Sequence, residues 1–74
     1  MRAQRYRRNP TETVHRLDVG NGYGKVGDLF VDDRKILFQL RHHGFVTVLT
    51  PIRPPWEGAK AEVRGKEVWW VDEE

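Results

Sequence analysis

Apolar and polar residues alternate with a period of two over much of the chain after residue 11. Successive side chains of a β-strand point to opposite faces, so this alternation predicts strands rather than helices. The third predicted strand has the clearest pattern, because Ile36, Phe38 and Leu40 share one face. The strands predicted up to this point are residues 12–19, 25–31 and 36–41.

Glycine, asparagine and aspartate mark the turns between these strands. Asn21-Gly22, within the sequence GNGYG at residues 20–24, predicts a type I′ hairpin that joins the first two strands in antiparallel fashion. A phosphate-binding loop would need a following helix and a lysine or acidic residue at a set distance, which this stretch lacks. Asp32-Asp33-Arg34 predicts the next turn.

His42-His43-Gly44 predicts a three-residue hairpin loop after the third strand. This register places Arg41 opposite Phe45. The expected core face then consists of Ile36, Phe38, Leu40, Val46 and Val48. The opposite face keeps several apolar side chains, so both faces of this hairpin are expected to be partly covered.

A proline-rich connection, residues 50–58, leads to a last hairpin with strands at 59–63 and 67–71. A Val63-Arg64-Gly65 loop is favoured, because it places Glu62 opposite Lys66. A two-residue Arg64-Gly65 loop is the other register. The competing interpretation is a short helix over Trp56–Arg64 that is capped by Gly65.

Two tryptophans lie next to each other in the last predicted strand. The strand period places Trp70 on the face of Val68, and Trp69 on the face of Val71. A strand with apolar side chains on both faces is expected to be central in its sheet or covered on both sides. Together with Trp56, the pair is a candidate partner-binding set.

The pattern as a whole predicts an all-β protein, a small five-stranded antiparallel barrel or strongly bent sheet. In strand number and length the layout looks like SH3-type barrels first and OB-type barrels second, in architecture only. Residues 1–10 are expected to form a flexible basic arm, and residues 11–74 a single small domain. A chain of 74 residues buries a limited core, so its stability is expected to be marginal.

The composition excludes several classes of site. The chain has no cysteine, and its three histidines are not spaced as zinc ligands. No apolar run is long enough to span a membrane, and the basic N-terminus is not followed by the apolar region of a secretory signal. We therefore expect a cytoplasmic protein with no membrane association, no metal and no cofactor.

Charge is distributed unevenly, although the net charge is only +2. Residues 1–16 carry five arginines and one glutamate, and the C-terminal residues are acidic. Arginine binds phosphate bidentately and stacks on bases, and tyrosine stacks too. The sequence therefore predicts nucleic-acid binding of low specificity, with these candidate residues: Arg2, Arg5, Tyr6, Arg7, Arg8, Tyr23, Arg41 and Arg53.

The alternative is a protein–protein interaction module, an adaptor or regulator that docks on a larger protein or on itself. Its support is the surplus of apolar residues on both faces of several strands, including the tryptophan-bearing hairpin. We expect no enzyme activity and no small-molecule substrate, because no nucleophile, base and orienting group are spaced to come together.

Overall fold

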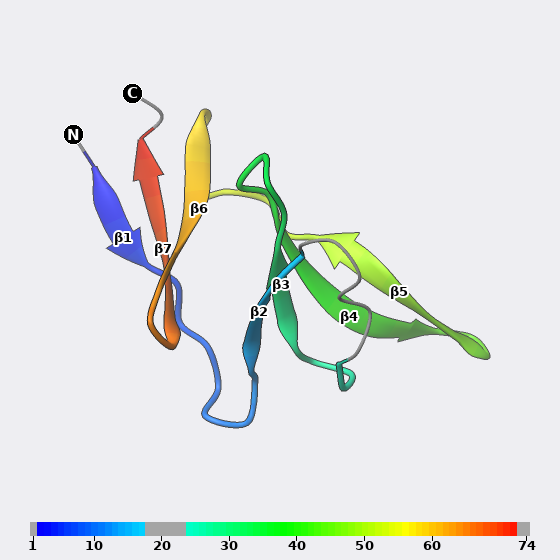
Figure 1. Cartoon of the computed structure of the whole chain (residues 1–74). Coiled ribbons are helices and arrows are strands. Elements are labelled where there is room, and N and C mark those ends of the chain that lie inside the picture. The colour runs from blue at the N-terminus through cyan, green and yellow to red at the C-terminus, as the bar shows by residue number, and fades with distance from the viewer. Residues whose placement is uncertain (1, 18–23, 73–74) are drawn as a thin grey trace.

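The protein is all-β in a computed structural model that describes residues 2–17 and 24–72. Seven strands and no helix occur in these residues, arranged in two sheets (Figure 1). The strands are β1 (Ala3–Arg5), β2 (Val14–Arg16), β3 (Leu29–Val31), β4 (Leu37–His43), β5 (Val46–Pro51), β6 (Ala59–Arg64) and β7 (Glu67–Asp72). The prediction of an all-β fold is therefore confirmed.

The strands do not close into a barrel. One sheet has three strands in the order β1-β7-β6, and the other has four in the order β2-β3-β4-β5. All neighbours are antiparallel except β2 and β3, which are parallel. In Figure 1 the three-stranded sheet lies on one side, and the β4–β5 hairpin extends away from it on the other.

The core lies where the two sheets meet. Leu29, Val31 and Leu37 come from the four-stranded sheet, and the other sheet contributes Ala59, Ala61, Val68 and Trp70. The alanines on β6 allow the sheets to approach closely, and the Ala61 N–H donates to the Lys35 carbonyl at 2.9 Å. Burial alternates with period two along β6 and β7, whereas all three residues of β3 are buried.

The antiparallel pairing expected for the first two strands is wrong. Val14 lies opposite Leu29 and Arg16 opposite Val31 in a parallel register. Parallel neighbours need a crossover connection instead of a tight hairpin. The predicted Asn21-Gly22 turn itself lies outside the described residues.

The loop and register predicted for the β4–β5 hairpin are also wrong. His43 pairs with Val46 and Leu40 with Leu49, so the loop is Gly44-Phe45 and both histidines belong to β4. Gly44 alone of the two loop residues has a positive φ, +67°, which is the type II′ pattern. The predicted core face is wrong as well, because Val46 and Val48 are exposed and its three β4-side members are only partly buried. On the opposite face only Leu37 is fully buried, and Phe45 and Leu49 are exposed.

The last hairpin has neither of the predicted registers. Arg64 pairs with Glu67 around a Gly65-Lys66 loop, and Glu62 lies opposite Trp69. Gly65 takes φ +62° at the first loop position, as in a second type II′ turn. The helix over Trp56–Arg64 is absent, because burial alternates along β6 with period two.

The N-terminal segment is not a separate flexible arm over its whole length. Residues 3–5 form β1, which pairs with β7, so that Ala3 lies opposite Val71 and Arg5 opposite Trp69. Strand β7 is consequently the central strand of its sheet, between β1 and β6. This confirms the expectation that a strand with a tryptophan on each face is central in its sheet.

Candidate functional site

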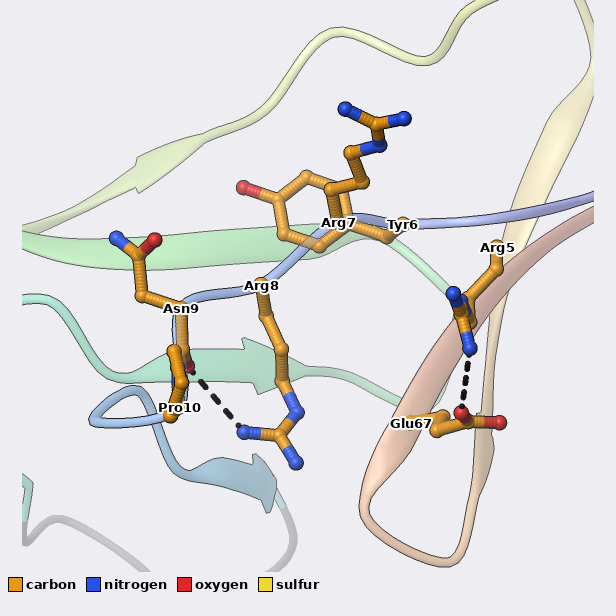
Figure 2. A pocket seen from close by; sticks show the side chains of 7 residues that line it. All are labelled: Arg5, Tyr6, Arg7, Arg8, Asn9, Pro10 and Glu67. Atoms are coloured by element: carbon orange, nitrogen blue, oxygen red, sulfur yellow. Dashed lines mark hydrogen bonds and ion pairs between the residues drawn. The ribbon is translucent and has the colours of Figure 1, made fainter.

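Four of the predicted nucleic-acid-binding residues line one surface hollow. Its lining is Arg5, Tyr6, Arg7, Arg8, Asn9, Pro10 and Glu67, and its volume is about 670 Å³ (Figure 2). The Tyr6 N–H donates to the Val68 carbonyl at 2.8 Å, just beyond the end of β1. Pairing with β7 therefore fixes the backbone that carries these side chains.

The three arginines of the hollow differ in how they are used. Arg5 forms an ion pair of 3.1 Å with Glu67, in which both side chains are largely exposed. The Arg8 guanidinium donates to the carbonyls of Lys66 at 2.6 Å and Glu12 at 2.8 Å. Arg8 therefore connects the N-terminal segment to the β6–β7 turn by a hydrogen bond.

Arg7 is the arginine of this hollow that stays open to a ligand. Its side chain is exposed and makes no hydrogen bond or ion pair with any described residue. Figure 2 shows the Arg7 guanidinium on the opposite side of the segment from those of Arg5 and Arg8. The three guanidiniums therefore do not converge: Arg5 is in an exposed ion pair, Arg8 is bound to backbone carbonyls, and the open Arg7 points to the other side of the segment.

Tyr6 is less available for base stacking than its sequence context suggests. The ring is half-buried and packs against the core. Burial raises the pKa of the Tyr6 phenol, Glu12 raises it further, and Arg41 acts in the opposite direction. Arg41 Nε donates to Gln39 Oε1 at 2.9 Å, and Gln39 Nε2 donates to Glu12 at 3.0 Å.

The remaining predicted nucleic-acid-binding residues do not join this hollow. The Arg2 guanidinium lies over the Trp56 ring at 5.1 Å, and the Arg2 N–H donates to Asp72. Arg53 is exposed on a different hollow, beside the proline-rich connection. Tyr23 lies outside the described residues. The predicted set is thus divided between separate parts of the surface.

Each of the three tryptophans has a contact within the fold. Trp70 is only 4% exposed and belongs to the core, so a partner cannot reach it in the folded chain. The Trp56 indole donates to Asp72 at 2.8 Å. Trp69 is half-buried, with the Arg64 guanidinium over its ring at 5.1 Å. A partner-binding role stays a prediction for Trp56 and Trp69.

The most exposed apolar surface lies elsewhere, on the β4–β5 hairpin. Phe45 at the loop is fully exposed, at 108% of its reference area, and three side chains of β5 are also exposed: Val46, Val48 and Leu49. The predictions treated Val46 and Val48 as core residues and did not select Phe45 as a site. The available signal was the run of residues 44–52, which contains no charged side chain.

A histidine and an aspartate form a pair that spacing did not predict. His15 Nε2 lies 2.9 Å from Asp28 Oδ2, and the His15 ring stacks on Phe30 with 4.8 Å between centroids. Asp28 is buried and also accepts hydrogen bonds from the N–H groups of Lys25 and Thr13. In the hydrogen bonds of this pair that involve the described residues, the other donors are backbone N–H groups and no side-chain hydroxyl takes part, as in a structural network.

Two further observations concern the part of the chain that the structure describes. It contains no cluster of three metal-ligating side chains. None of its elements is a helix long and apolar enough to cross a membrane. Searches of protein-family models, curated proteins and solved structures returned no match for the chain.

Proposed function

We propose that the protein is a non-enzymatic interaction module that docks on a protein through its β4–β5 hairpin. The observation that carries this proposal is the exposure of four apolar side chains, Phe45, Val46, Val48 and Leu49, on one projecting element. Exposed apolar surface on small soluble proteins commonly marks interaction sites, and here it lies on both faces of β5 and at its loop. Fully burying an exposed side chain of this size contributes roughly 1.5–3 kcal/mol, so Phe45 can contribute most and the partly covered Val46, Val48 and Leu49 less.

The architecture that we propose for this module is a small, open SH3-like fold, with an OB-like fold as the second choice. Two packed, mainly antiparallel sheets and a strongly projecting hairpin support this choice. A cytoplasmic location stays a prediction from the absence of cysteine.

Site-specific photo-crosslinking tests the docking proposal. A photoreactive phenylalanine analogue replaces Phe45 in cells that express the full chain, and a matched variant carries it at the exposed Glu57, outside the hairpin. We expect protein adducts from position 45 and few from position 57. The proposal is wrong if position 45 gives no protein adduct, or if both positions give the same products.

Nucleic-acid binding is the second candidate, and one observation favours it. Arg5, Tyr6, Arg7 and Arg8 line a single hollow in which Arg7 is open. Each phosphate neutralised on a single strand contributes about 0.7 to the slope of log K against log salt. This second candidate therefore predicts weak, strongly salt-dependent binding of oligonucleotides.

Fluorescence anisotropy with single- and double-stranded oligonucleotides tests this candidate. We expect Arg7→Ala to weaken binding and to lower the salt slope by about 0.7 for a single strand. Arg34→Ala is the matched control, because Arg34 is exposed and lies in the turn before β4. No binding at about 50 mM salt, or equal effects of the two substitutions, contradicts the proposal.

A further inference from the structure

Strand β5 is an open edge of the four-stranded sheet. Leu40 on β4 donates its N–H to Asp28 and accepts from the Gly27 N–H, so its backbone groups point away from β5. Because antiparallel pairs alternate, Leu49, which lies opposite Leu40, directs its own N–H and C=O to the open edge. Thr47, two residues earlier, does the same. The N–H and C=O groups of Thr47 and Leu49 can therefore hydrogen-bond to another strand at this edge.

The edge of β5 lacks the features by which proteins prevent edge pairing. Charged side chains, prolines, bulges and short length are the usual devices. The other three edge strands have them: β1 and β2 each contain three residues, and β6 alternates Lys60, Glu62 and Arg64. Strand β5 has six residues, no charge and no proline before Pro51. Its β-branched residues also favour an extended pairing partner.

We propose that β5 pairs with β5 of a second copy, antiparallel, with Val48 on the twofold axis. This inference rests on the proposed function of the hairpin as the docking element. Thr47 then lies opposite the partner's Leu49, and Leu49 opposite the partner's Thr47. Both residues expose their backbone groups at the edge, so the register forms four intersubunit hydrogen bonds. The result is one continuous sheet through both subunits.

The neighbouring registers leave some of these edge groups of Thr47 and Leu49 without a strand partner. Moving the axis to Leu49 places Thr47 opposite the partner's Pro51, which has no N–H to donate. Moving it to Thr47 places Leu49 opposite the partner's Phe45, which is in the loop rather than in a strand. The Val48 register pairs Thr47 and Leu49 with strand residues that both accept and donate.

Charge also favours a second copy as the occupant. Residues 44–52 are neutral, so two copies meet without like-charge contacts along the edge. The basic side chains of the hairpin, Arg41, His42 and His43, lie on β4. The two β4 strands of the dimer are three strand spacings apart, about 14 Å. That distance exceeds the screening length of about 8 Å at physiological salt.

Cysteine crosslinking tests the register, because the natural chain has no cysteine. Val48 faces itself across a non-hydrogen-bonded pair, where Cα atoms lie about 4.5 Å apart, within the range for a disulfide. We expect Val48→Cys to form a covalent dimer under mild oxidation. Thr47→Cys is the control. Residue 47 lies opposite the partner's Leu49 in this register, so the two copies of residue 47 are two positions apart along the strands. Their Cα atoms are then about 8 Å apart, beyond disulfide reach. Equal crosslinking of the two variants overturns the register.

Sedimentation equilibrium of the full chain tests the pairing itself. We expect a concentration-dependent dimer, with Val48→Lys raising the dissociation constant at least about tenfold, because it places two lysines opposite each other. Val26→Lys is the matched control, since Val26 is also exposed but lies outside the hairpin; it should leave dimerisation unchanged. A strict monomer at about 1 mM, a concentration that detects even weak association, overturns the inference.

The crosslinking at Phe45 separates this inference from the proposed function. If the chain is a monomer and Phe45 captures a different protein, self-pairing is wrong and the docking function stands. If the chain is a monomer and Phe45 captures nothing, both are wrong. A dimer in which Phe45 reacts with the partner's hairpin supports both.

Discussion

The buried carboxylate of Asp28 gives the sharpest test of what stabilises this fold. Its Oδ2 accepts the Lys25 N–H and lies within hydrogen-bond distance of His15 Nε2, both at 2.9 Å, and Oδ1 accepts the Thr13 N–H at 3.3 Å. The residue is only 4% exposed, so water cannot replace these bonds freely. The carboxylate thus connects β2, the turn before β3 and the start of β3.

Replacing Asp28 by alanine removes all three interactions. Their donors lie on the partly buried His15 and on the exposed residues Thr13 and Lys25, so water can replace these bonds in part. Hydrogen bonds to charged groups contribute about 1.5–3 kcal/mol each, so the expected loss in the free energy of unfolding is about 2–4 kcal/mol after this partial replacement. A chain of this length has a total stability of roughly 4–11 kcal/mol, so Asp28→Ala is expected to remove a large part of it. Asp28→Asn keeps one acceptor oxygen and should lose about 1–2 kcal/mol.

Urea unfolding followed by tryptophan fluorescence measures these losses. Asp33→Ala is the matched control, because Asp33 is exposed in the turn before β4, and its loss should stay below about 0.5 kcal/mol. The reasoning fails if Asp28→Ala costs less than about 1 kcal/mol, or if the alanine and asparagine variants are equally stable, since the cost would then not follow the number of hydrogen bonds lost.

Three further predictions concern stability. Burial acts to raise the pKa of Asp28, but the hydrogen bonds that it accepts outweigh burial and hold its pKa below the usual value. The stability that the ionised carboxylate contributes should therefore be lost as the pH falls below about 4. Urea unfolding at several pH values should show a smaller loss of stability in acid for Asp28→Asn than for the natural chain. Gly24→Ala places a Cβ 2.6 Å from the buried Phe30 ring and should cost about 1–3 kcal/mol in thermal unfolding; an unchanged Tm contradicts this. Trp70→Ala should cost about 3–5 kcal/mol by circular dichroism, and Trp69→Ala less than half as much; equal losses would show that both rings are core.

The class of fold could be predicted from the sequence, because the period of two is a local property of each strand. The sequence also predicted that the tryptophan strand is either central in its sheet or covered on both sides, since Trp69 and Trp70 point to opposite faces, and the structure shows the first of these. Registers could not be predicted. A shift of one residue reverses which side chains are buried, and the type II′ turns at Gly44 and Gly65 fix that shift by backbone conformation.

Long-range pairing was the other part that the sequence could not supply. The parallel contact between β2 and β3 depends on a crossover, and the pairing of β1 with β7 joins residues about as far apart in sequence as the chain allows. The candidate site shares this limit. Arg5, Tyr6, Arg7 and Arg8 are neighbours in sequence, but their roles depend on Glu67, Val68 and Lys66, which only the folded sheet brings close.

The basic N-terminal segment has a structural role that changes how its charge is interpreted. Arg5 pairs with Glu67, and Arg8 holds the turn between β6 and β7, so these two cations help to attach β1 to the tryptophan-bearing sheet. Deleting the segment would uncover one edge of β7 and destabilise the fold, whatever the protein binds. Loss of nucleic-acid binding after such a deletion would therefore not distinguish a binding arm from a structural strand. Arg7→Ala does distinguish them, because Arg7 contributes charge to the same hollow without a bond that holds the sheet.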